Sequence, residues 1–174
     1  MAIYGNKNEV RYEILNQIKS NMTLLKFLYY VDELNKDITT LPDLTHSQIK
    51  EVTDNYIYKC QKVEAKRDVD KKCYISMNYG TKQYHASNNP YFNGNSFDIY
   101  VMCDRDVDYN KSNGSRIDAI EACIASIFDN GEVGCIGKSK IDTSEPINIK
   151  GSDYVGVHIP IVFFNGNKDL GSGF

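Results

Sequence analysis

Several features typical of enzymes, metal proteins and membrane proteins are scarce in this sequence. The 174 residues include no Trp, four Pro and three His, and the five Cys form no Cys-x-x-Cys pair. His46, His85 and His158 are far apart, so no local metal-ligand spacing is present. The longest apolar runs, such as 159–164, are far too short to span a bilayer. Neither a His- and Cys-based metal site, a cofactor nor a membrane-spanning segment is therefore expected.

Charge, cysteine content and the N-terminal residues favour a protein that is made and kept in a cytoplasm. The formal net charge of -3 gives no strong field that would recruit nucleic acid. The stretch MAIYGNKNEV lacks the apolar segment of a secretory signal. An odd number of widely spaced Cys argues against a disulfide framework. We expect five reduced thiols, several of them in the core.

Apolar periodicity predicts two main helices and one short helix. Residues 9–34 carry apolar side chains at spacings of three and four, with a break predicted at Asn16 or Asn21. A Thr-x-x-Gln capping box at Thr45 predicts a short helix near 45–54. Ser115 begins the second main helix with a Ser-x-x-Asp cap, and Asn130-Gly131 ends it.

Alternating patterns predict strands at 73–79, 97–103 and 154–164. Two more strands, at 134–142 and 146–150, are predicted to pair around the turn DTSEP. Pro160 indicates a free sheet edge beside the last strand. The Asn- and Gly-rich segment 80–96 is expected to be a long loop or extended arm, and 166–174 a frayed tail.

Together these elements predict one domain over residues 1–174 with an α+β fold. Consecutive strands with short connections favour a mainly antiparallel sheet of about four to six strands. The two main helices are expected on one face of that sheet, together with the short helix near 45–54.

Two motifs resemble ligand-binding loops but fail on spacing and context. GEVGCIGKSK contains Gly-Lys-Ser, yet Glu132 occupies the position where a phosphate-binding loop needs its first Gly, and a strand rather than a helix is predicted there. Asp104, Asp106 and Asp108 have EF-hand spacing, but Tyr109 and Ser115 replace the required Gly and Glu. A cation held by the three carboxylates and a solvated loop both remain open readings.

Catalytic patterns are equally sparse, and surface aromatic residues suggest protein contacts instead. No Gly-x-Ser-x-Gly elbow is present, and an enzyme would require a pocket built from His158, Asp104 or Lys138. The chain has 13 Tyr, several of them in or beside the 80–96 arm, where rigid amphipathic rings suit an interface or a half-buried sheet face. The candidate contact residues are Tyr84, His85, Tyr91, Phe92, His158 and Pro160.

A series of segments resembles the neck and tail-terminator proteins of tailed bacteriophages. The first is LLKFLYYVDELNKDITTLPDLT at 24–45. FDIYVMCDRDVDY, SRIDAIEACIASIFDN, GCIGKSKID and YVGVHIPIVFF follow in the same order, and the similarity covers about residues 10–165. The long YHASNNPYFNGNS arm and the polar region 56–72 depart from the pattern.

The resemblance implies a structural protein without an active site. Such proteins form a ring, usually of six subunits, that ends the tail tube and joins it to the head connector. The implied partners are further copies of the chain, the tail tube protein and the connector, with DNA passing through the lumen unbound. The implied location is the head–tail junction of a virion. Another connector protein, an adaptor or stopper, and a small cytoplasmic enzyme are the alternative hypotheses.

Overall fold

A computed structural model describes residues 7–58, 72–80, 84–85, 93–129, 131–133, 137–148, 150 and 152–164. The helices are α1 (Lys7–Ser20), α2 (Met22–Tyr29), the 3-10 helix η1 (Ile38–Thr40), α3 (His46–Asn55), α4 (Arg105–Asp108) and α5 (Arg116–Phe128). The strands are β1 (Ile57–Tyr58), β2 (Cys73–Tyr79), β3 (Tyr84–His85), β4 (Asn93–Asp104), β5 (Tyr109–Asn110), β6 (Gly114–Ser115), β7 (Glu132–Val133), β8 (Gly137–Ile141), β9 (Glu145–Asn148) and β10 (Tyr154–Phe164). The predicted tail at 166–174 lies outside the described residues.

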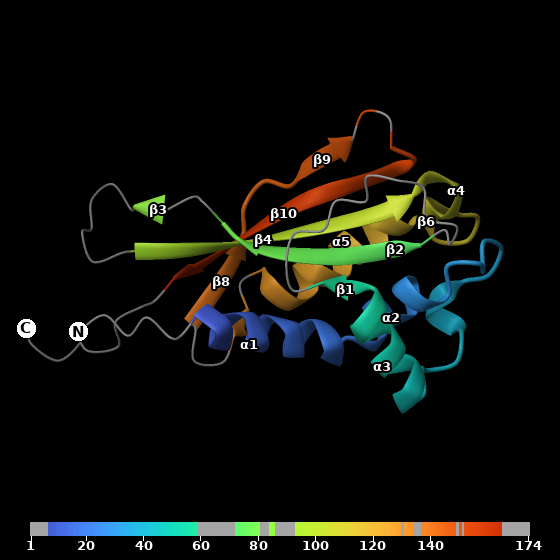
Figure 1. Cartoon of the computed structure of the whole chain (residues 1–174), viewed down its shortest axis with the longest axis horizontal. Coiled ribbons are helices and arrows are strands. Elements are labelled where there is room, and N and C mark those ends of the chain that lie inside the picture. Colours follow the sequence, from blue (N-terminus) through green and yellow to red (C-terminus); the bar gives the residue numbers. More distant parts are fainter. Residues whose placement is uncertain are drawn as a thin grey trace, which may run out of the picture.

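The fold is α+β with a mainly antiparallel sheet, as predicted. Six strands follow one another in the order β1-β2-β4-β10-β8-β7, while β3 pairs with β4 and β9 with β10. The β1–β2 pair is parallel, and the other pairs of the sheet are antiparallel. Figure 1 shows β4 and β10 running side by side through the middle of the sheet. None of the described helices is both long and apolar enough to cross a membrane.

Local capping signals set the helix boundaries. The predicted break occurs at Asn21, whose side chain accepts a hydrogen bond from the Leu24 amide and so begins α2 as a separate helix. Thr45 and Gln48 form the predicted reciprocal capping box of α3. Ser115 caps α5 by accepting from the Asp118 amide. Asp129 is the C-cap of α5, and Asn130, the predicted stop, lies outside the described residues.

The main core lies between the helices and one face of the sheet. Alternate residues of β4, which are Phe97, Ile99, Val101 and Cys103, are all fully buried in it. They pack with apolar side chains from α1, α2, α3 and α5 and with the same-face residues of β2 and β10. These four residues share one face because side chains alternate along a strand, and that face is the one turned toward the helices.

The opposite face of the sheet also contains buried apolar side chains. Tyr74, Met102 and Tyr154 form a second, smaller buried cluster on adjacent strands. The Tyr74 ring lies 5.6 Å from the Tyr154 ring and 5.6 Å from the Tyr58 ring, centroid to centroid. Cross-strand aromatic packing of this kind stabilises neighbouring strands, so both faces of the sheet contribute to cohesion.

The predicted hairpin around the DTSEP turn is wrong. β8 and β9 both pair with β10, β9 along Val155–His158 and β8 along Ile161–Phe164. The two short strands therefore lie end to end beside one long strand. β10 spans 11 residues and provides backbone partners for both, whereas a β8–β9 hairpin would leave one of them away from the sheet.

The free edge predicted beside Pro160 is also wrong, because β10 is an interior strand with β4 on its other side. Pro160 lies at the junction between the two registers, after His158 pairs with β9 and before Ile161 pairs with β8. Its carbonyl accepts from the Asp142 amide at 2.9 Å. A residue without an N–H is tolerated inside the sheet where one neighbouring strand gives way to the next.

Cys73 and Cys103 correct the expectation of five reduced thiols. They are pairing partners on β2 and β4 and are joined as a disulfide, although 30 residues separate them in sequence. Both are fully buried. The strand register, which sequence spacing does not reveal, brings the two side chains to the same place on the same face. Among the described cysteines, Cys123 is the free thiol.

Gly156 lies where β4 packs closely against the backbone of β10, so a substitution there tests this packing. A Cβ at this position would stand 2.3 Å from the Val101 carbonyl oxygen and 2.4 Å from the Met102 sulfur. We expect Gly156→Ala to lower the free energy of unfolding by about 1–3 kcal/mol, because the backbone of β4 has to move. Urea denaturation followed by circular dichroism measures the change.

Gly114→Ala is the matched control for that variant. Gly114 has φ +76° and no heavy atom within 4 Å of an added Cβ, so its methyl group meets backbone strain alone. We expect a loss of about 1–2 kcal/mol there. An unchanged urea midpoint for Gly156→Ala would contradict the packing described.

Candidate interaction surfaces

The predicted arm at 80–96 includes a described β-ladder. β4 begins at Asn93, four residues before the part of it that pairs with β2. Tyr84 and His85 form β3 and pair with Gly94 and Asn93. In Figure 1, β3 and the first part of β4 extend away from the body of the sheet. Two other candidate contact residues, Tyr91 and Phe92, lie outside the described residues.

His158 and Pro160 lie in the middle of the sheet, not on the arm. The His158 Nε2 atom lies 3.1 Å from Asp98 Oδ1, an ion pair when the imidazole is protonated, although it lacks the geometry of a hydrogen bond. The imidazole stacks on Tyr100 with ring centroids 4.8 Å apart and 13° between planes. Burial, and then the Asp98 charge, raise the pKa of Tyr100. Pro160 is buried within its own chain.

The residues of the alternative enzyme hypothesis do not converge. Asp104 pairs with Tyr154 at one end of β10, and Lys138 pairs with Phe164 at the other end. Ten residues of extended strand separate those two partners, which is roughly 33 Å at the usual rise per residue. His158 lies between them, so the three side chains are distributed along the strand and share no pocket.

The two segments that resemble ligand-binding loops, one around Asp104–Asp108 and one containing Gly-Lys-Ser, make structural contacts. Asp104 caps α4 by accepting from the Asp106 amide, and Asp108 accepts from the Ile117 amide at the start of α5. Within the described residues, no group of three His, Cys, Asp or Glu side chains is arranged to hold a metal ion. In the Gly-Lys-Ser segment, buried Ser139 donates to the Phe128 carbonyl at 2.7 Å and belongs to a strand.

Arg116, at the start of α5, is the largest fully buried side chain of the described residues. Its Nε donates to the Val107 carbonyl at 2.9 Å, and its two terminal nitrogens donate to the carbonyls of Phe27 at 3.1 Å and Val31 at 3.2 Å. The guanidinium thus joins the last turn of α2 to α4. Burial lowers the pKa of Arg116, while the charges of Asp108 and Asp32 oppose that effect.

Two asparagines fix the segment that follows α2. The amide of fully buried Asn110 donates to the carbonyls of Glu33 and Lys36, and its oxygen accepts from the amides of Ser112 and Asn113. The Asn113 side chain accepts from the Ile38 amide and donates to the Asp37 carboxylate. Hydrogen bonds from Asn113 and Thr39 lower the pKa of Asp37.

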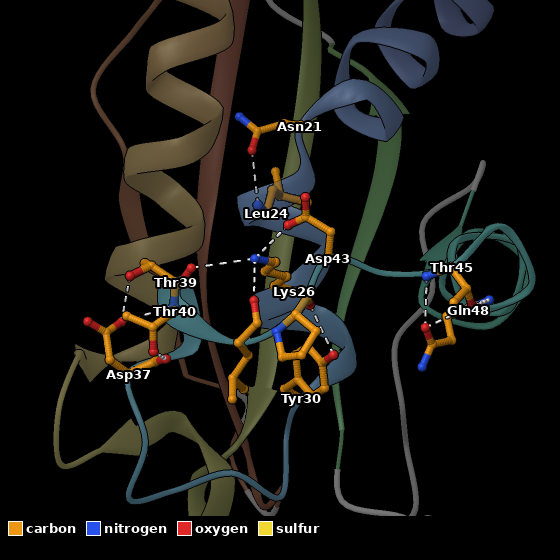
Figure 2. A network of polar contacts seen from close by, with 12 residues as sticks. Asn21, Leu24, Lys26, Tyr30, Asp37, Thr39, Thr40, Asp43, Thr45 and Gln48 are labelled. Carbon is orange, nitrogen blue, oxygen red and sulfur yellow. Dashed lines mark hydrogen bonds and ion pairs between the residues drawn. The ribbon is translucent and has the colours of Figure 1, made fainter.

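Lys26 anchors the far end of the same segment, as Figure 2 shows. Its ammonium group donates to the carbonyl of Leu41 at 2.6 Å and of Thr39 at 3.4 Å. The Asp43 carboxylate lies 2.7 Å away. Lys26 is only 7% exposed although it belongs to the middle of α2. A buried ammonium needs several acceptors, and residues 39–43 provide them.

The result is a rigid surface, here called the acidic platform, formed by residues 30–43 and 104–118. The buried side chains of Lys26, Asn110 and Arg116 donate hydrogen bonds to its backbone carbonyls and so hold it in place. Its outer side chains include Tyr109, which is 65% exposed. Loops are usually variable and mobile, so these buried polar contacts hold the platform more firmly than is usual for a loop.

Comparison with known protein families matches residues 21–163 to one family model, YomW. The chain belongs to the YomW family. A chain from the virion of a native gene transfer agent (GTA) particle has a similar fold, with a TM-score of 0.52 at 10% sequence identity. The alignment covers 92% of this chain and 97% of that chain. No curated protein sequence matches.

The YomW match contains the whole acidic platform and its anchors. It starts at Asn21, the N-cap of α2, and ends within β10. α1 precedes it. The buried role of Arg116 was not predicted from the sequence, in which it is simply the second residue of the segment SRIDAIEACIASIFDN. The available signal was a charged residue, Arg116, next to the apolar stripe of a predicted helix, where burial requires a set of acceptors.

Replacing Arg116 tests the guanidinium contacts. Arg116→Met leaves three buried carbonyls without their donor, and we expect a loss of about 3–5 kcal/mol in the free energy of unfolding. Arg116→Lys should recover only part, because an ammonium cannot reproduce the planar fork. The control is Arg105→Ala, since Arg105 is exposed and bonds Asn148 at 3.0 Å. Equal losses in Arg116→Met and Arg105→Ala would contradict this role.

Replacing Lys26 tests the anchor locally. In Lys26→Met, we expect faster hydrogen exchange at the amides of Thr40 and Leu41, which close η1 by bonding to Asp37 and Ile38. The α5 amides should keep their protection, because they are held elsewhere. Lys50→Met, which removes an exposed ammonium, is the control. Unchanged exchange at Thr40 and Leu41 in a folded Lys26→Met protein would show that Lys26 does not hold the segment.

Proposed function

We propose that this protein is a structural component of a virion-type particle, in which copies of the chain form a closed ring at the head–tail junction. The ring ends the tail tube and joins it to the head connector. The observation that carries the proposal is the fold likeness to a chain of the gene transfer agent virion, which extends over nearly the whole of both chains. The ordered series of segments resembling tail terminators supports the more specific role.

The architecture fits a ring subunit. A ring repeats one heterologous interface until it closes, so each subunit needs two different contact surfaces on a rigid body. The β3–β4 arm and the acidic platform provide two such surfaces. They lie at opposite ends of the sheet in Figure 1. Tyr84 and His85 belong to the arm and are the proposed contacts with a neighbouring copy. His158 and Pro160 are proposed to act by shaping the sheet behind that contact.

Native mass spectrometry over a concentration series tests ring formation. We expect one dominant closed oligomer, a hexamer, which grows with protein concentration because association follows mass action. Negative-stain images of that species should show a ring with a central opening. A monomer at every concentration, alone and mixed with the tail tube protein, would overturn the proposal. Immunogold labelling of purified particles should mark the head–tail junction, and a label on the head or fibres would contradict the location.

A further inference from the structure

The two ends of β10 differ in charge. Near Tyr154, at the beginning of the strand, β10 pairs with the end of β4, from which the acidic platform continues. Near Phe164, at the end of the strand, β10 pairs with Lys138 and Lys140 of β8. The second end also carries the beginning of β4 and the arm, since Phe163 pairs with Asn95. The acidic platform and the lysines of β8 therefore lie at opposite ends of the sheet.

The acidic platform carries the negative charge of the chain. Residues 30–43 and 104–118 contain eight acidic and four basic side chains, a formal charge of -4, whereas the whole chain has -3. Of the basic side chains Arg116 is buried and Arg105 is exposed, while among the acidic ones Asp104 is buried and Asp43 pairs with Lys26. The exposed acidic residues include Asp32 and Asp118, one from each segment.

The opposite end presents lysines. Lys138 and Lys140 are both exposed, and they share one face of β8 because they are two residues apart. Glu132 of β7 is the pairing partner of Lys138, while Lys140 pairs with the apolar Val162 of β10.

Each end also has an exposed aromatic residue near it. Tyr109 lies on the acidic platform and is 65% exposed. Tyr12 is 61% exposed on α1, a helix that contacts β7, the strand that pairs with β8. These two are the large apolar side chains that the described part of the chain leaves exposed. Tyrosines of this kind are frequent anchors in protein interfaces.

We propose that the acidic platform of one copy binds the basic end of a second copy, with Tyr109 and Tyr12 as apolar anchors of the contact. The inference rests on the proposed ring and names the surfaces that form it. The contact is heterologous, because two different surfaces meet, and it leaves one free acidic and one free basic end on every pair. Addition of copies continues until the ring closes.

The anchoring of the platform serves this contact. Lys26, Asn110 and Arg116 hold the platform backbone before any partner arrives. A surface that is already ordered loses little conformational entropy on binding, so modest charge complementarity is enough for association. Complementary charges also fix which end meets which, since two acidic or two basic ends repel.

Paired charge reversal tests the contact. The acidic-end variant is Glu33→Lys/Asp118→Lys, which avoids Asp32 because its charge offsets that of buried Arg116. The basic-end variant is Lys138→Gln/Lys140→Glu, in which Gln avoids placing Glu opposite Glu132. Glu51→Lys on α3, outside both ends, is the matched control. Circular dichroism and urea denaturation first establish that every variant is folded.

Each variant alone should associate at least tenfold more weakly than the wild type or the control in native mass spectrometry. A 1:1 mixture should restore the oligomer with the two variants in equal numbers, because the new lysines of one variant then face the new glutamate of the other, while the two unmutated ends form the wild-type contact. The wild-type oligomer should also dissociate as salt concentration rises.

Three results would overturn the inference. If both folded variants associate like the wild type, the ring exists but uses other surfaces, and the proposed function stands. The same holds if each variant is weakened but the mixture stays dissociated. If the wild type remains monomeric at every concentration, the ring and this contact both fail.

Discussion

The buried guanidinium of Arg116 is the contact on which the arrangement of helices depends. A charge inside a protein is stable only when hydrogen-bond acceptors surround it. Here the acceptors are the carbonyls of Phe27, Val31 and Val107, from two separate stretches of chain. The last turn of a helix always leaves carbonyls without intrahelical donors. Arg116 satisfies such carbonyls at the end of α2, so the end of one helix is defined by the beginning of another.

The long strand β10 organises the sheet in a comparable way. It pairs with β4 along one side, and with β9 and then β8 along the other. Pro160 occupies the junction between β9 and β8, the place in an interior strand where a missing N–H leaves no vacant ladder position. Gly156 permits the close approach of β4. Pro160 suits the side of β10 that faces β8 and β9, and Gly156 suits the side that faces β4. Backbone geometry, not hydrophobicity, explains both residues.

Local signals in the sequence predicted the local structure well. The caps at Thr45 and Ser115 are confirmed, because a capping residue and its partner lie within one helical turn, and of the two predicted breaks, Asn16 and Asn21, the structure has the one at Asn21. The α+β class and the buried face of β4 follow from periodicity. The Cys73–Cys103 pair and the end-to-end placement of β8 and β9 were missed, since both depend on register between strands distant in sequence. The anchors of the acidic platform were missed because they too join segments distant in sequence: Asn110 donates to the Glu33 carbonyl across 77 residues.

The chemical difference between the two ends of the molecule has a consequence for assembly. A protein with identical contact surfaces forms closed pairs, whereas one with two unlike, complementary ends forms chains or rings. Here the polarity is built into the topology, because β4 and β10 are antiparallel. The end of β4 leads into the acidic platform, and the end of β10 lies beside the lysines of β8. Reversing either strand would place both charged regions at one end. The direction of these two central strands therefore places the acidic platform and the lysines of β8 at opposite ends of the sheet, which is the arrangement that the proposed contact between copies requires.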